Sequence, residues 1–225
     1  MSASDDLVLL DLDGTLTDSA PGILASVRHA YGVLGLPVPA EPLLRGFVGP
    51  PLGESFTAHG VPVDLVADAV AAYRDVYAAG KLLDNAVYPG IPECLTALRG
   101  AGLRLAVATS KPEPMARRIV EHFGLGAHLD RGLDDVFGAT LDGSRSTKGD
   151  VVAHALASLG APRRAVMVGD REHDVLGAAA HQIPCVGVAW GYARPGELAA
   201  AGATVVVGTP AELVTLLLDR ELPAA

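Results

Sequence analysis

Short apolar runs that end near a Gly, Asp or Ser recur along the chain and alternate with segments of helical period. The runs are LVLLD, LRLAVAT, AVMVGD, IPCVGVAW and ATVVVG. Segments between and after them, such as PECLTALRGAG, PMARRIVEHFG, GDVVAHALASLG and PAELVTLLLDREL, carry apolar residues at helical spacing. Strands that are apolar on both faces and alternate with helices are typical of a parallel sheet covered on both sides. The sequence therefore predicts a doubly wound α/β fold, with ligands bound beyond the carboxyl ends of its strands.

One part of the chain departs from this alternation. Between about residues 20 and 85, PGILASVRHAYGVLG, EPLLRGFVG and PVDLVADAVAAYRDVYAAGKLL are helical in period, with no strand between them. The Pro-Gly turn in NAVYPGIPE marks the return to the α/β pattern. We therefore expect a core domain made of residues 1–18 and 86–225, and an inserted helical cap domain at 19–85.

Charge and composition limit the partners of the chain. A formal net charge of −9 without a basic run argues against nucleic acid as a partner. No apolar stretch approaches the roughly 20 residues of a membrane helix, and no signal peptide is recognisable. Cys94 and Cys185 are far apart and suggest core residues in a reducing compartment. We expect a cytoplasmic protein that is a monomer or a homodimer.

Two aspartates, Asp11 and Asp13, follow the first apolar run. Residues i and i+2 of an extended chain project to the same side, so both carboxylates can face one pocket. One aspartate can act as a nucleophile, and its neighbour can transfer protons as general acid and base. Taken alone, the pair is equally consistent with a polar turn that closes a core strand.

A second pair of acids, Asp170 and Asp174, follows the run AVMVGD. Their spacing of four places both on one face of a helix. Asp170 alone could be a helix N-cap, and Asp174 a partner of the helix dipole. Four acidic groups crowded at one edge of a sheet would repel each other without a cation, however, and an all-oxygen shell favours Mg²⁺.

Hydroxyls and lysines complete the set of candidates. Thr109 and Ser110 end the run LRLAVAT, and Pro112 follows in a first-turn position of the next helix, whose free N–H groups suit phosphate. Lys148 lies near the start of another helix, against the helix dipole, which suggests an anionic partner. Lys111 is a rival for the same role, and the spacing does not choose between the two lysines.

The segments DLDGT, VATS, TKGD and GDREHD, in this order, resemble the four motifs of the haloacid dehalogenase superfamily, whose members are mostly Mg²⁺-dependent phosphatases. The likeness spans nearly the whole chain. The helical insertion after the first motif resembles the cap of the subfamily that includes phosphoglycolate phosphatases, phosphonatases, dehalogenases and β-phosphoglucomutases.

The resemblance implies a role for each motif residue. It implies that Asp11 is the nucleophile and Asp13 the general acid and base. It implies that the phosphate is held by Thr109, the Ser110 backbone and Lys148. The implied Mg²⁺ ligands are the Asp11 carboxylate, the Asp13 backbone carbonyl and Asp170, while Asp174 supports the metal shell or orients Lys148.

The implied substrate is a small phosphorylated metabolite. The second aspartate, Asp13, favours phosphate-ester chemistry over dehalogenation, and the cap stretch RGFVGPPLGESF resembles those of phosphoglycolate-phosphatase-like proteins. Arg45, His59 and Lys81 are the cap residues expected to read the substrate anion, although each is also an ordinary surface residue type. A 5′-nucleotidase, a sugar-phosphate phosphatase, a β-phosphoglucomutase and a non-catalytic phosphate-binding module remain alternatives.

Overall fold

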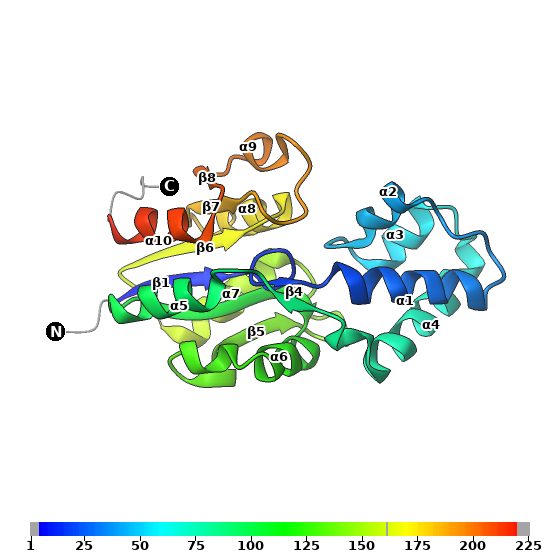
Figure 1. The fold of residues 1–225 in the computed structure, drawn as a ribbon, viewed down its shortest axis with the longest axis horizontal. Helices are drawn as coiled ribbons and strands as arrows, with labels where there is room; N and C mark the ends of the chain where they lie inside the picture. Colours follow the sequence, from blue (N-terminus) through cyan, green and yellow to red (C-terminus); the bar gives the residue numbers. More distant parts are fainter. Residues whose placement is uncertain (1–4, 161, 220–225) are drawn as a thin grey trace. The chain divides into compact units, whose positions relative to one another are not determined.

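A six-stranded parallel sheet forms the core of one of the two compact units of the computed structural model, which describes residues 5–160 and 162–219 (Figure 1). The strands lie in the order β5-β4-β1-β6-β7-β8, and every neighbouring pair is parallel. Their bounds are β1 Asp6–Leu10, β4 Arg104–Pro112, β5 Val136–Ala139, β6 Arg164–Gly169, β7 Cys185–Val188 and β8 Val205–Val207. The predicted parallel α/β fold is confirmed.

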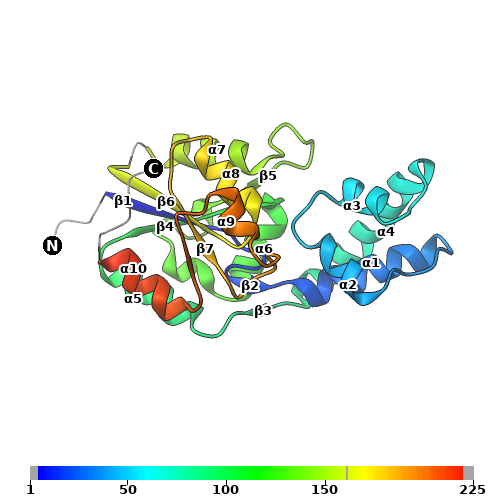
Figure 2. The same cartoon turned by 90° about the horizontal axis from the view of Figure 1, so that it is seen from above.

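Helices cover both faces of this sheet. Figure 2 shows α5 and α10 on one side, with α7 and α8 on the other. The helices are α5 Ile91–Gly100, α6 Glu113–His122, α7 Lys148–Leu159, α8 Glu172–Ala179, α9 Glu197–Ala201 and α10 Pro210–Leu218. The last helical segment of the sequence was expected to continue to residue 222, which lies outside the described residues. None of the described helices combines the length and the apolar character needed to cross a membrane.

The register of β1 determines which residues meet at the edge of the sheet. Every residue of β1 is buried, and Leu10 lies opposite Val107 of β4 and Val168 of β6. Asp11 follows Leu10 directly, while Thr109 and Asp170 come two residues after those partners. Side chains from three distant parts of the sequence are thus brought to the same carboxyl edge.

A buried apolar layer fixes α7 and α8 on the sheet. Val151, Val152 and Ala155 of α7 belong to the same core cluster as Leu9 and Met167 of the two central strands. Burial of a Leu, Val or Met side chain stabilises a fold by roughly 1.5–3 kcal/mol. This packing holds the first residue of α7, Lys148, near the end of β1.

Both cysteines belong to the interior, as predicted. Cys94 and Cys185 are buried free thiols. Burial raises the pKa of the Cys94 thiol to about 11. These side chains therefore act as small apolar residues in the core.

A second compact unit spans Asp18–Ala86. It contains α1 Ala20–Val33, α2 Glu41–Leu44, α3 Leu52–Ala58 and α4 Val66–Ala79, together with the 3-10 turns Arg45–Phe47, Val63–Leu65 and Lys81–Leu83. Tyr31, Phe47 and Phe56 pack against one another with ring centroids 5.1–6.4 Å apart. Two-residue strands, β2 Thr17–Asp18 and β3 Ala86–Val87, pair where the chain enters and leaves this unit.

The capping box of α7 gives the first prediction. Thr147 Oγ1 accepts a hydrogen bond from the Asp150 N–H at 3.1 Å, and Asp150 Oδ2 accepts one from the Thr147 N–H at 3.1 Å. We expect Thr147→Ala to lower the free energy of unfolding by about 1 kcal/mol, because one helix N–H loses its acceptor. Urea denaturation measures this. Thr147→Ser, which keeps the hydroxyl, is the control; equal losses in both variants would contradict the cap.

Candidate active site

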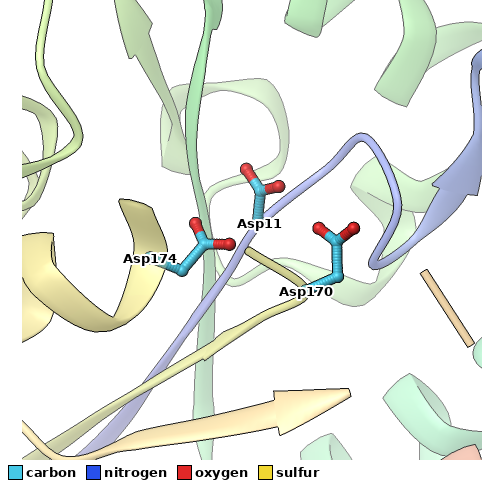
Figure 3. A group of neighbouring side chains, drawn as sticks. All are labelled: Asp11, Asp170 and Asp174. Atoms are coloured by element: carbon cyan, nitrogen blue, oxygen red, sulfur yellow. The ribbon is translucent and has the colours of Figure 1, made fainter. Parts of the chain in front are cut away.

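Three carboxylates converge beyond the ends of the two central strands. Asp11 follows β1, Asp170 follows β6 and Asp174 lies in the first turn of α8; one oxygen from each lies within 4.8 Å of the others. All three residues are buried. Figure 3 shows the three carboxylates pointing into the same region, although Asp11 is far from the other two in sequence. The predicted meeting of the two acidic motifs is confirmed by this geometry.

The prediction that Asp170 and Asp174 share one face of a helix is wrong. The helix α8 begins at Glu172, so Asp170 lies ahead of it and does not share a helix face with Asp174. Asp170 is not the N-cap either, because that position is held by Arg171. The two carboxylates meet because the chain turns between β6 and α8, and Asp174 Oδ2 accepts a hydrogen bond from the Arg171 N–H at 3.0 Å.

Lys148 links two of the three carboxylates. Its Nζ lies 2.6 Å from Asp11 Oδ1 and 2.7 Å from Asp174 Oδ1, and it donates to the carbonyl oxygen of Ala108 at 2.9 Å. The lysine stem crosses Gly177, where a Cβ atom would lie 2.6 Å from Lys148 Cγ. A glycine at that point of α8 leaves room for the stem of Lys148.

Lys111 contacts a different carboxylate. Its Nζ lies 2.6 Å from Asp13 Oδ2. The other oxygen, Asp13 Oδ1, is buried without a hydrogen-bond partner among the residues that the structure describes. The two lysines that the sequence spacing could not separate therefore have separate positions. Lys148 lies with the nucleophile candidate and Lys111 with the proton-transfer candidate.

Thr109 and Ser110 lie within the last part of β4, which continues to Pro112. Thr109 is buried, and its Oγ1 accepts a hydrogen bond from the Lys111 N–H at 3.2 Å. The pairing of β4 with β5 is irregular between Ala108 and Pro112. The helix α6 begins at Glu113, so Pro112 is its N-cap, and the expected first-turn position of Pro112 is wrong by one residue.

The electrostatics of this edge favour a divalent cation. With all four ionised, Asp11, Asp13, Asp170 and Asp174 carry two more negative charges than Lys111 and Lys148 balance among these six described groups. Burial raises the pKa of Asp11 to about 6, against the attraction of Lys148. Burial, and then Asp174 and Asp11, raise the pKa of Asp170 well above its ordinary value. Carboxylate oxygens are the ligands that hard divalent cations prefer.

Lys148 stays protonated in this environment. Burial disfavours its charged form, but the attraction of Asp11 and Asp174 outweighs burial and raises the pKa of Lys148 above its ordinary value. A buried group that stays charged can neutralise an incoming anion without first taking up a proton.

The cap residues singled out from the sequence lie in the helical unit 18–86. Lys81 pairs with Asp84 at 2.6 Å. The ring of His59 packs on Phe47 with centroids 4.7 Å apart, and its Nδ1 lies 2.7 Å from the Ser55 carbonyl oxygen. These contacts give Lys81 and His59 local structural roles. Arg45 is exposed at the start of a 3-10 turn and stays a prediction.

The sequence reasoning missed the residues that surround Asp170. Its Oδ2 accepts a hydrogen bond from the Tyr192 N–H at 2.7 Å, and Thr15 Oγ1 lies 3.5 Å from its Oδ1. The indole of Trp190 donates to the Thr15 carbonyl oxygen at 3.0 Å. The position of this loop in the chain could have indicated its role, because residues that follow β7 lie at the same carboxyl edge of the sheet as the motif residues.

Curated relatives cover most of the chain. The tyrosine-protein kinase PtkA of Mycobacterium tuberculosis is 51% identical over 90% of this chain and 68% of that protein. A 5′-nucleotidase of Pseudomonas aeruginosa is 42% identical over 86% of each chain. A phosphoglycolate phosphatase of Cupriavidus necator is 37% identical over 97% of this chain and 96% of that protein.

A solved structure and a family model agree with these relatives. A crystal structure from Clostridium acetobutylicum, described as a predicted phosphatase, aligns with a TM-score of 0.87 and 40% identity over 95% of this chain and 98% of that one. The family model for haloacid dehalogenase-like hydrolases matches residues 8–188. This match includes Asp11, Thr109, Lys148 and Asp170. The chain belongs to the haloacid dehalogenase-like hydrolase family.

Proposed function

We propose that the protein is a Mg²⁺-dependent phosphatase that hydrolyses a small phosphomonoester through an aspartyl phosphate on Asp11. The observation that carries the proposal is the buried cluster of Asp11, Asp170 and Asp174, in which Lys148 pairs with Asp11 and Asp174. The family and the named phosphatases among the relatives support a phosphoric monoester hydrolase.

The metal site is assigned to the acidic cluster. Asp11 and Asp170 would supply carboxylate ligands, Asp13 its backbone carbonyl, and Asp174 a further carboxylate or the support of Lys148. The excess negative charge of the cluster fits a divalent ion. When bound, Mg²⁺ supplies charge neutralisation that lets one anion approach another and stabilises charge on the transferring phosphoryl group.

The residues of the core then divide the reaction between them. Lys148, Thr109 and the Ser110 backbone hold the phosphate oxygens, and an Asp11 oxygen attacks the phosphorus in line with the leaving group. The P–O bond to the leaving alcohol breaks, and Asp13 gives that oxygen a proton. Asp13 next takes a proton from the attacking water, which releases inorganic phosphate and free Asp11. The Asp13 Oδ1 oxygen is buried without a hydrogen-bond partner among the described residues, which supports this assignment.

We assign the helical unit 18–86 as the cap that selects the substrate by its leaving group, with Arg45 as the candidate anion-binding residue of this unit. Phosphoglycolate is the leading substrate candidate, and 5′-nucleotides and sugar phosphates follow. The 5′-nucleotidase and phosphoglycolate phosphatase relatives support this range. Two free buried thiols are consistent with a cytoplasmic protein, which we propose acts as a monomer or homodimer.

A second candidate function is phosphoryl transfer to protein tyrosine. The relative named as a tyrosine-protein kinase is 51% identical, and this chain spans 68% of it. The same nucleophile serves both reactions if a tyrosine hydroxyl replaces water as the acceptor. Labelled ATP with a tyrosine-containing polymer separates the two functions, because transfer labels the polymer and hydrolysis labels only free phosphate.

Loss of the nucleophile gives the second prediction. Asp11→Asn is expected to lower phosphate release from the best ester of a panel by about 10³-fold or more, because an amide oxygen is a poor nucleophile. The panel contains phosphoglycolate, 5′-nucleotides and sugar phosphates, each assayed with Mg²⁺ and with a chelator. Asp130→Asn, a partly exposed aspartate paired with Arg99, is the matched control. Equal turnover in wild type and Asp11→Asn would contradict the mechanism.

The raised carboxyl pKa values give the third prediction. Metal-free Asp11, with a pKa of about 6, must lose its proton before it can bind a cation. Mg²⁺ affinity should therefore rise as the pH rises through about 6, with protons released on binding. Calorimetry in two buffers of different ionisation enthalpy measures both effects. An affinity that stays constant from about pH 5 to about pH 8 would show that these carboxylates are not the ligands.

A further inference from the structure

The loop between β7 and α9, residues 189–196, lies directly against the acidic cluster. It provides the Tyr192 N–H that donates to Asp170 Oδ2 at 2.7 Å. It also provides the Trp190 indole, which donates to the Thr15 carbonyl oxygen at 3.0 Å. The loop therefore contacts both Asp170 and the turn that follows the nucleophile.

Gly191 shows how closely this loop approaches the cluster. A Cβ atom on Gly191 would lie 2.4 Å from Asp170 Cβ and 2.4 Å from the Gly14 carbonyl oxygen. Real Cβ atoms do not come so near to other heavy atoms. The backbone of the loop is thus in direct contact with Asp170, and a shift of the loop must move that carboxylate.

Glu197, the first residue of α9, fastens the end of this loop. Its side chain is 3% exposed, and its Oε1 accepts from Arg171 Nε at 2.7 Å and from the Glu172 N–H at 3.1 Å. Its Oε2 accepts from the Arg194 N–H at 3.1 Å and from Arg194 Nε at 3.3 Å. One carboxylate thereby joins the 189–196 loop to the first residues after Asp170.

Glu197 stays ionised in the folded protein. Burial alone would favour the neutral acid, but the hydrogen bonds from Arg171, Arg194 and Glu172 outweigh it and lower the pKa of Glu197 to about 2. Charge-assisted hydrogen bonds of this kind are about twice as strong as neutral ones. Glu197 is therefore ionised at neutral pH, and its carboxylate accepts all four of these hydrogen bonds.

Glu197 is connected to the proposed metal ligands Asp174 and Asp170 through two separate sets of hydrogen bonds. Through Arg171 and Glu172 it holds the turn whose Arg171 N–H donates to Asp174 Oδ2 at 3.0 Å. Through Arg194 it holds the loop whose Tyr192 N–H donates to Asp170. Groups that orient metal ligands without touching the ion commonly change metal affinity by about 10–100-fold when they are lost.

We propose that Glu197 is a positioning residue of the metal site: it ties the 189–196 loop to the turn before α8 and so sets the orientation of the Asp170 and Asp174 carboxylates. The inference rests on the proposed function only in requiring that this cluster binds a divalent cation. A purely structural Glu197, serving only the start of α9, would affect stability and leave metal binding unchanged.

The test is the Mg²⁺ affinity of Glu197→Gln, measured by calorimetry on the metal-free protein. The amide has nearly the same shape but no charge, and it cannot accept all four hydrogen bonds. The Mg²⁺ dissociation constant is expected to rise about tenfold or more. Glu212→Gln is the matched control, because Glu212 accepts from the Gly208 N–H at the start of α10. Its Mg²⁺ affinity should equal that of the wild type.

Each outcome decides one question. If the wild type itself does not bind Mg²⁺, the proposed metal site is wrong. If the wild type binds and Glu197→Gln binds equally well, the positioning role is overturned, whatever the melting temperature of the variant. If Glu197→Gln does not fold, Gly191→Ala tests the same coupling, since it displaces the loop from Asp170 and leaves Glu197 intact. A wild-type Mg²⁺ affinity in Gly191→Ala would then overturn the proposal.

Discussion

The ion pairs of Lys148 with Asp11 and Asp174 are the contacts on which the rest of the site depends. They join the end of β1, the start of α7 and the first turn of α8 through one buried ammonium group. Isolated buried charges cost several kcal/mol each, so neither the carboxylates nor the lysine is stable in this position alone. The fold leaves space for this cluster: a Cβ on Gly169 would lie 2.2 Å from Asp174 Cγ.

Pairing does not neutralise the edge of the sheet completely. Burial and the repulsion of Asp174 raise the pKa of Asp11 against the attraction of Lys148. Burial and the repulsion of Asp174 and Asp11 raise the pKa of Asp170 against the Tyr192 hydrogen bond and the attraction of Arg171. Ionisable groups whose pKa values are shifted by burial and by specific charged neighbours are typical of functional sites. The surrounding apolar layer of the sheet and α7 provides the stability that this arrangement lacks.

Much of this architecture could be predicted because it follows from periodicity and from strand ends. The runs before Asp11 and Asp170 are strands, and both aspartates lie where a parallel sheet gathers its ligands. The strand Val136–Ala139 was missed, since four residues between a 3-10 turn and a loop give too short a pattern. The choice between Lys111 and Lys148 depended on the reach of long side chains, which spacing does not encode.

The surroundings of Asp170 were less accessible to prediction. The Tyr192 N–H is a backbone donor, and a backbone donor cannot be predicted from the type of residue that carries it. The contact of Glu197 with Arg171 joins positions that are 26 residues apart in sequence. The start of α8 at Glu172 depended on local turn geometry, and a spacing of four residues does not reveal that geometry. These features arise only when the loop after β7 folds back on the turn after β6.

The central claim is that Asp11 attacks phosphorus directly, so that hydrolysis consists of two displacements. The stereochemical course at phosphorus tests it most directly. A phosphorothioate monoester made chiral with two oxygen isotopes is hydrolysed by the wild-type protein in water that contains the third isotope, and the configuration of the released thiophosphate is determined. Two in-line displacements predict overall retention of configuration. Inversion would mean a single attack by water and would contradict the role of Asp11 as nucleophile.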